Sequence, residues 1–231
     1  MKVLSVNVGL PRRVKFQRQY ISTGIFKSPV RRRLKLSRMN FEGDKQADLK
    51  VHGGEYKAVY SYPSEHYSYW RTKLKRSDLP FGMFGENLTT EGMFEDDVNI
   101  GDEFKVGSAR LVATQPRMPC YKLGIRFGNM NMVKEFMASG RPGIYFKVLD
   151  EGEIGAGDVI ELIRKDENEV TVKDIVKLYL RSNTDEESNT IRRALRIKYL
   201  PKGWRTHFES QVSISAAESN KISHELIDKG K

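Results

Sequence analysis

The sequence predicts a mainly β fold, either a barrel or a sandwich, with short inserted helices and a C-terminal three-helix unit. Residues 1–165 contain many short apolar segments separated by glycine and proline turns, a pattern typical of such folds. Helical periodicity interrupts them at 63–74 and 129–139, and dominates the chain after residue 165. We therefore predict a β domain at 1–165, a helical domain at 166–212 and a polar tail at 213–231.

The composition limits the classes of protein to which the chain can belong. Its 231 residues are 39% hydrophobic and 10% aromatic, which is enough for a packed core. Apolar runs stay well short of the roughly 20 residues of a membrane span, and the first residues lack the apolar block of a signal peptide. One cysteine cannot form an internal disulfide, so we expect a cytoplasmic protein. The net charge of +10 indicates an anionic partner, which could be nucleic acid, a phosphorylated cofactor or an acidic protein.

Strand signals follow one another along the predicted β domain. Residues 1–8 alternate apolar and polar side chains and predict an opening strand. Lys27 and Ser28 form a polar turn before Pro29, which argues against a central strand or a helix interior there. A strand with a basic exposed face is expected at 30–39. Further strands are expected at 57–62, on both sides of a turn within 98–107, at 109–114 and at 144–148.

The first inserted helix is predicted from the spacing of its apolar side chains. Tyr67, Trp70 and Leu74 recur at intervals of three and four residues and form a packing face within 63–74. We interpret His66, in the same helix, as a structural residue. A second short amphipathic helix is expected at 129–139.

The C-terminal helical unit has clear start signals. Thr171 and Asp174 form a Thr-x-x-Asp start that resembles a capping box. Two more helices are expected to begin at 184 and 201. This unit also carries a basic stripe, whose members are Arg192, Arg193, Arg196, Lys198 and Arg205.

The lone cysteine, Cys120, lies in the segment with the strongest functional signal. Arg117, Lys122 and Arg126 surround it, and cations favour the thiolate, the form that attacks electrophiles and binds soft metals. Prolines on its N-terminal side predict a shaped loop or a strand edge. Two interpretations remain open on these residues alone, a reactive or ligating thiol and a small buried hydrophobic side chain.

Two glycine-containing loops are further candidates for contacts with an anion. Gly53 and Gly54 follow His52 and precede Lys57, a combination that predicts a turn contacting an oxyanion or phosphate. The loop at 81–92 is ambiguous by itself, because its polar residues are also common in turns.

Several spaced segments, in this order along the chain, resemble the motifs of MOSC-domain proteins, in particular the YiiM-type branch linked to resistance against 6-N-hydroxylaminopurine. The segments are 23–27, 43–54, 84–88, 100–102 and 115–120. The resemblance covers residues 1 to about 165, and the helical unit is similar to the small three-helix domain of YiiM-type proteins. It implies a closed β-barrel of the MOSC or pyruvate-kinase β-barrel type.

The resemblance also implies a molybdenum cofactor, in which a phosphorylated pterin carries the metal. Cys120 is then the metal ligand at the catalytic centre, and His52, Tyr145 or water is the proton relay. Glu86 departs from the related amidoxime-reducing proteins, which have arginine there, so no cofactor role is carried over to it. The expected cofactor-binding residues are Lys27, Ser28, Arg31, His52, Gly53, Gly54, Lys57, Asn87, Gln115, Arg117, Lys122, Arg126 and Tyr145.

The activity implied by the resemblance is reduction of N-hydroxylated bases and related N-oxygenated compounds, a detoxification in which a separate flavin or ferredoxin-type reductase supplies the electrons. One alternative is a non-catalytic carrier of cofactor or sulfur that uses a persulfide on Cys120. Another is nucleic-acid binding through the basic stripe, but we prefer a solvated helix face, and docking of the reductase uses the same charge equally well. A homodimer is compatible with the sequence.

Overall fold

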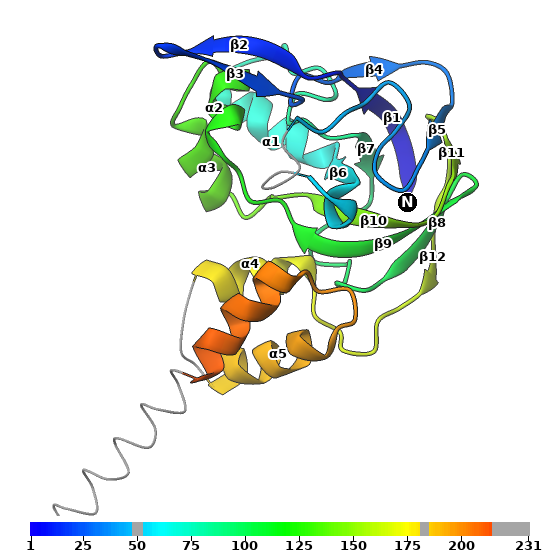
Figure 1. Ribbon diagram of the computed structural model, residues 1–231, viewed down its shortest axis with the longest axis vertical. Coiled ribbons are helices and arrows are strands. Elements are labelled where there is room, and N and C mark those ends of the chain that lie inside the picture. The colour runs from blue at the N-terminus through cyan, green and yellow to red at the C-terminus, as the bar shows by residue number, and fades with distance from the viewer. Residues whose placement is uncertain (48–52, 181–184, 214–231) are drawn as a thin grey trace, which may run out of the picture.

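An eight-stranded mixed sheet forms the centre of the molecule (Figure 1). The computed structural model describes residues 1–47, 53–180 and 185–213. The strands run in the order β12-β8-β9-β10-β6-β7-β1-β4, and the pairs are antiparallel except for β6 and β7. Their bounds are β1 Lys2–Val8, β4 Ser28–Val30, β6 Val59–Pro63, β7 Leu88–Glu91, β8 Glu103–Val106, β9 Ala109–Pro116, β10 Ile144–Asp150 and β12 Ile160–Arg164.

The prediction of a closed barrel is wrong for the described part of the chain, where the mixed sheet has two edge strands, β12 and β4. An isolated bridge between Lys2 and Val159, followed by one more backbone hydrogen bond from Gly157 to Val3, joins the start of β1 to the residues before β12. The edge strand β4 has three residues and contains Pro29, which has no N–H to donate to a further strand. A strand this short cannot supply the continuous ladder that barrel closure requires.

Two small sheets accompany the large one. The hairpin of β2, Arg12–Phe16, and β3, Gln19–Thr23, was not expected from the sequence. The second sheet pairs β5, Leu34–Leu36, with β11, Gly152–Ile154. The single strand expected at 30–39 is therefore two short strands that belong to different sheets. The expected strand before the turn in 98–107 is reduced to one bridge, between Asn99 and Thr171.

The inserted α-helices pack on an aromatic core of their own. Helix α1, Glu65–Leu74, confirms the first prediction, since Tyr67 and Trp70 are fully buried. His66 is buried with its Nε2 atom 2.8 Å from Glu95, which confirms a structural role. The other inserted helices are the short 3-10 helix η1, Glu55–Lys57, and the helices α2, Tyr121–Phe127, and α3, Met132–Ala138.

The C-terminal helices pack against the face of β9 and share its core (Figure 1). They are α4, Val172–Leu180, α5, Asp185–Arg196, and a helical segment at 202–213. One continuous apolar cluster joins the sheet to these helices, so the unit is not packed as an independent body. Within the described chain, no helix has the length and apolar character needed to cross a membrane. The predicted tail lies outside the described residues from 214 onward.

Two members of the basic stripe have structural roles. Arg193 donates to the carbonyl oxygen of Asn168 at 3.1 Å, and Arg205 donates to the carbonyl oxygens of Leu195 and Ile197 at the end of α5. The remaining members are exposed on the surface, and they are Arg192, Arg196 and Lys198.

The predicted capping box at the start of α4 is confirmed. The hydroxyl of Thr171 accepts from the N–H of Asp174 at 3.0 Å, and the carboxylate of Asp174 accepts from the N–H of Thr171 at 3.1 Å. Each side chain thus satisfies an N–H that the helix itself leaves without an acceptor.

Replacing Thr171 by alanine should therefore destabilise the protein. The N–H of Asp174 loses its acceptor, and the free energy of unfolding should fall by about 1 kcal/mol in urea denaturation followed by circular dichroism. Thr72→Ala is the matched control, because Thr72 is exposed in α1 and caps no helix start. Equal losses in the two variants would show that the capping box does not support α4.

Candidate functional site

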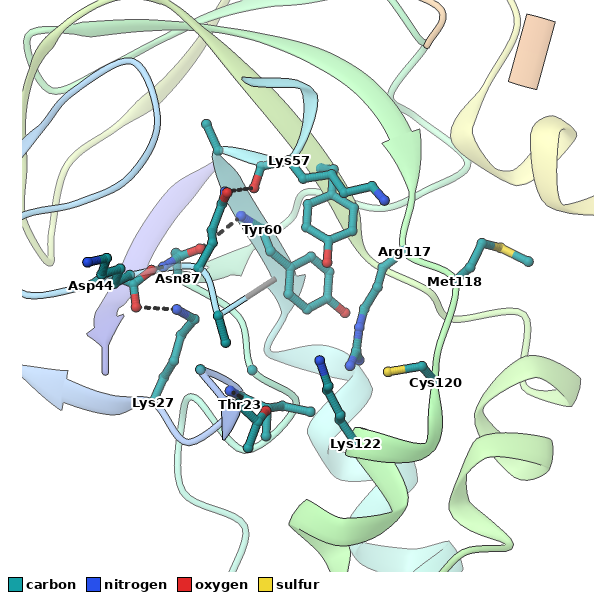
Figure 2. A pocket seen from close by; sticks show the side chains of 18 residues that line it. Thr23, Lys27, Asp44, Lys57, Tyr60, Asn87, Arg117, Met118, Cys120 and Lys122 are labelled. Atoms are coloured by element: carbon teal, nitrogen blue, oxygen red, sulfur yellow. Dashed lines mark hydrogen bonds and ion pairs between the residues drawn. The ribbon is translucent and has the colours of Figure 1, made fainter. Parts of the chain in front are cut away.

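A cavity with an empty volume of about 730 Å³, including its opening to solvent, lies at one end of the sheet (Figure 2). Five segments that are far apart in the sequence supply most of its lining. They are 23–27, 44–47, 57–60, 85–87 and 117–122, to which β10 adds Tyr145. The cavity therefore collects the turns and strand ends that surround β6, β7 and β9.

One wall of the cavity is a buried polar network centred on Asp44. Its carboxylate forms an ion pair with Lys27 and accepts from the amide of Asn87 at 2.8 Å and from the N–H of Gly9 at 3.0 Å. The carbonyl oxygen of the Asn87 side chain accepts from the N–H of Tyr60 at 3.2 Å. Burial lowers the pKa of Lys27, and the charge of Asp44 opposes this shift. The network fixes four of the lining segments around a locally neutralised charge pair.

Glu86 lies next to this wall but takes no part in the lining. Its buried carboxylate accepts from the hydroxyls of Tyr67 and Thr89 and from the N–H groups of Gly82 and Phe84. Burial raises the pKa of Glu86, and these donors act in the opposite direction. The carboxylate thus shapes the loop that places its neighbours in the cavity.

The position of Gly85 leaves no room for a side chain. Its φ is +81°, and a Cβ atom would lie 2.8 Å from the side chain of Ile25. Any larger residue would push apart two of the segments that line the cavity.

The opposite wall carries a buried cation without a complete set of partners. Arg117 is 6% exposed, and its Nη1 atom is buried without a hydrogen-bond acceptor. Its guanidinium lies 5.2 Å from the ring centroids of both Tyr60 and Phe136. An unsatisfied buried N–H of a charged group costs free energy, so this wall is suited to an anionic ligand.

The tyrosines beside Arg117 remain protonated. Burial raises the pKa of Tyr60 and of Tyr145, although the charge of Arg117 opposes both shifts. The hydroxyl of Tyr60 is committed to the carbonyl oxygen of Pro142 at 2.7 Å. The two phenols therefore add neutral polar surface to the cavity.

Cys120 is half-buried and directly precedes α2. The prediction of a loop or strand edge describes residues 117–120 but missed the helix that follows. In Figure 2 the thiol of Cys120, the guanidinium of Arg117 and the ammonium group of Lys122 point toward one another inside the cavity. A soft ligand and two cations thus share one wall.

The structure brings together about half of the predicted site residues. Those that line the cavity are Lys27, Lys57, Asn87, Arg117, Cys120, Lys122 and Tyr145.

The other predicted residues lie outside the lining. Ser28 and Arg31 are exposed at the edge strand β4 and just after it, and Gly53 and Gly54 precede η1 beside the cavity. His52 lies outside the described residues.

Gln115 and Arg126 have other surroundings. The amide of Gln115 donates to the carbonyl oxygen of Tyr56 at 3.3 Å and accepts from the indole N–H of Trp204 at 3.1 Å, so it ties β9 to the third C-terminal helix. Arg126 lies one helical turn beyond Lys122 on α2.

Sequence reasoning missed five polar lining residues, which are Thr23, Asp44, Lys45, Gln46 and Tyr60. Asp44 and Gln46 lie inside the quoted segment 43–54, but nothing local marks either as a partner of Lys27 or Lys57. Gln46 accepts from the N–H of Gly54 at 2.9 Å and donates to the carbonyl oxygen of Lys57 at 3.0 Å. For Tyr60 no signal existed, because a tyrosine in a strand is ordinarily part of the core.

Comparison with known proteins assigns the family. A sequence model of the MOSC domain matches residues 48–161. YflK of Bacillus subtilis is 41% identical over 208 residues, which are 89% of this chain and 92% of that protein. YiiM of Escherichia coli is 34% identical over 184 residues, 79% of this chain and 81% of that protein. The chain belongs to the MOSC-domain family.

Solved structures agree with the assignment of this chain to the MOSC-domain family. The crystal structure of YiiM from Geobacillus stearothermophilus superposes with a TM-score of 0.75 at 30% identity and covers 91% of this chain and 98% of that chain. A Gibberella moniliformis protein named reductase is 39% identical over 126 residues, but these are 22% of its length. MOSC domains bind the molybdenum cofactor in the family, so a function related to this cofactor is consistent with the assignment.

The cavity of the MOSC protein fits such a cofactor. Molybdenum needs a soft thiolate, which Cys120 can provide, while the orphan Nη1 atom of Arg117 and the nearby lysines suit an anionic pterin and phosphate. Within the described ranges, no group of three or more His, Cys, Asp or Glu could hold a metal ion. The thiol of Cys120 can serve as the protein ligand of a metal that brings its other ligands with the cofactor.

The polar network around Asp44 predicts a sensitive substitution, Asn87→Asp. The change replaces a hydrogen-bond donor by a second carboxylate facing Asp44, and the free energy of unfolding should fall by about 3 kcal/mol in urea denaturation. Asn129→Asp is the matched control, because Asn129 is exposed and a carboxylate there can still accept from the N–H of Asn131. A similar small loss in both variants would contradict the structural role of the network.

Proposed function

We propose that this MOSC protein is a molybdenum-cofactor-dependent oxidoreductase. It reduces N-hydroxylated bases and related N-oxygenated compounds, among them 6-N-hydroxylaminopurine, and thereby detoxifies them. A separate flavin or ferredoxin-type reductase supplies the electrons. One observation carries this proposal. The same cavity is lined by the free thiol of Cys120 and by Arg117, a buried arginine whose Nη1 atom lacks an acceptor.

Individual residues have distinct roles in holding the cofactor. Cys120 would ligate molybdenum, and Arg117, Lys57 and Lys122 would bind the anionic pterin and its phosphate. Lys27 is already paired with Asp44, so its role is to hold the wall in place rather than to add free positive charge. The bound cofactor supplies two-electron redox chemistry at the metal.

The chain's own contribution to the reaction is binding and proton supply. Conversion of an N-hydroxylamine to an amine consumes two electrons and two protons, breaks the N–O bond and releases water. Tyr145 lines the cavity, and burial raises its pKa, so its hydroxyl stays protonated and can donate to the leaving oxygen. The hydroxyl of Tyr60 is held by Pro142 and serves to fix the ring under Arg117.

A carrier of cofactor or sulfur is the alternative use of the same thiol. A persulfide carrier must present its sulfur to a second protein. Cys120 is instead half-buried and shares the cavity with Arg117 and Met118, which favours a ligand that stays in place. A carrier would also show no turnover of N-hydroxylated bases with any reductant.

Cys120→Ser tests the proposed metal ligand. Because a hydroxyl is a poor ligand for a soft metal, protein made in a cofactor-sufficient host should lose most of its molybdenum and its reduction of 6-N-hydroxylaminopurine. Metal analysis, pterin fluorescence and turnover with a chemical reductant measure the three quantities.

The control for this substitution is Met118→Leu, which removes the other sulfur atom of the cavity while conserving its volume. This variant should keep its molybdenum content and its activity. Full molybdenum occupancy in Cys120→Ser would overturn the assignment of the ligand, whereas molybdenum without turnover in the unsubstituted protein would favour the carrier.

Arg117→Met tests whether the buried guanidinium serves the cofactor or the fold. In protein made without cofactor, the free energy of unfolding should be unchanged or higher by about 1 kcal/mol, because an apolar side chain of similar size replaces an unsatisfied charge. In a cofactor-sufficient host the same variant should retain much less pterin.

Arg141→Met is the matched control for this pair of measurements. Arg141 also lies over an aromatic ring, that of Tyr69, but it donates to the carbonyl oxygen of Ser139 at 2.9 Å and is outside the cavity. Its substitution should leave the pterin content unchanged. A loss of roughly 3 kcal/mol in cofactor-free Arg117→Met would instead identify Arg117 as a structural residue.

A further inference from the structure

Two arginines beside the cavity are held on one phenyl ring. The guanidinium carbon of Arg12 lies 3.5 Å from the ring centroid of Phe26, and that of Arg126 lies 5.0 Å from the same centroid. Among the described residues, neither guanidinium has an ion-pair or hydrogen-bond partner, and Nε of Arg126 is buried. We refer to Arg12, Phe26 and Arg126 as the arginine clamp.

The clamp brings like charges together without a counter-charge. Burial lowers the pKa of Arg126, and the neighbouring charge of Arg12 adds to this shift. Glu86 is a nearby carboxylate that acts in the opposite direction, but its oxygens are committed to Tyr67, Thr89 and two backbone N–H groups. Arg12 is exposed, whereas the buried Nε of Arg126 lacks an acceptor, and an external anion at the clamp can accept from both guanidiniums.

The clamp borders the cavity at each of its three residues. Arg12 pairs across the hairpin with Thr23, and Lys122 precedes Arg126 by one turn on the same face of α2. Phe26 sits in the segment 23–27 between two lining residues. None of the three clamp residues belongs to the lining itself, so the clamp is a neighbour of the proposed cofactor site and not a part of it.

We propose that the arginine clamp binds the phosphate of the substrate, so that N-hydroxylated purine nucleotides are preferred over the free bases. This inference rests on the proposed function. Two guanidiniums match the oxygens of a phosphate, and each can donate more than one hydrogen bond to it. Contact with the same phenyl ring holds both guanidiniums in position.

The geometry of α2 fits this class of substrate. Arg126 follows Cys120 by six positions, which corresponds to about 9 Å along a helix axis. A base that reacts near Cys120 can therefore extend its ribose along α2 and place its phosphate at the clamp. Because Nε of Arg126 is buried, a small anion fits the clamp better than the surface of a partner protein does.

Comparing a base with its nucleotide tests the proposal. The cofactor-loaded full chain is assayed with 6-N-hydroxylaminopurine and with its ribonucleoside 5′-monophosphate, using a chemical reductant so that docking of a protein donor plays no part. The nucleotide should have the higher kcat/KM by roughly tenfold or more. Arg12→Gln and Arg126→Gln should each lower kcat/KM for the nucleotide by roughly tenfold and leave that for the base unchanged.

Arg13→Gln is the matched control, since it removes the same charge from the next residue of β2, whose side chain points to the other face and lies over Tyr20. Calorimetric titration with adenosine 5′-monophosphate gives a readout that does not depend on turnover. Wild type should bind more tightly than Arg12→Gln and Arg126→Gln, and Arg13→Gln should bind as wild type does.

Each result decides the question. Equal kcat/KM values for base and nucleotide in the wild type, equal effects of Arg13→Gln and Arg12→Gln, or loss of molybdenum from Arg12→Gln would each overturn the clamp as a substrate site. If the wild type reduces neither compound, the proposed function fails. In that case, binding of adenosine 5′-monophosphate that depends on Arg12 and Arg126 would still support an anion site at the clamp. If the wild type did not bind this nucleotide, the anion site would be overturned as well.

Discussion

The candidate site depends on whether each buried cation has a partner inside the protein. At Lys27 the charge is neutralised inside the protein, because Asp44 pairs with it and Asn87 holds the carboxylate in place. At Arg117 the protein leaves the Nη1 atom without an acceptor. The first arrangement makes a rigid wall, and the second makes a binding surface whose missing partner is an anion.

The same contrast separates Glu86 from the arginine clamp. Glu86 is buried and satisfied by four donors, so it organises a loop and does not line the cavity. Arg12 and Arg126 lie on one ring with no acid bound to them in the described part of the chain. A charged residue close to the cavity is therefore functional or structural according to its partners, and its distance from Cys120 does not decide the matter.

The three-helix unit takes part in holding the site. The apolar core runs from the sheet into these helices, and Gln115 is held between Tyr56 of η1 and Trp204 of the last helix. Gln115 lies just before the segment that carries Arg117 and Cys120. A change in the packing of the helices would thus reach the cavity through β9, which gives the unit a structural role besides any docking of an electron donor.

The sequence by itself determined the elements with strong local signals, such as the packing face of α1 and the capping box of α4, and the order of the motifs that identified the family. It did not determine closure of the sheet, the hairpin of β2 and β3, or the partners of the basic residues. Lys27 and Asp44 are 17 positions apart, and Asp44 and Asn87 are 43 apart. Only the tertiary structure decided which cations are paired, because periodicity and capping act within a few residues whereas a buried charge finds its partner across the fold.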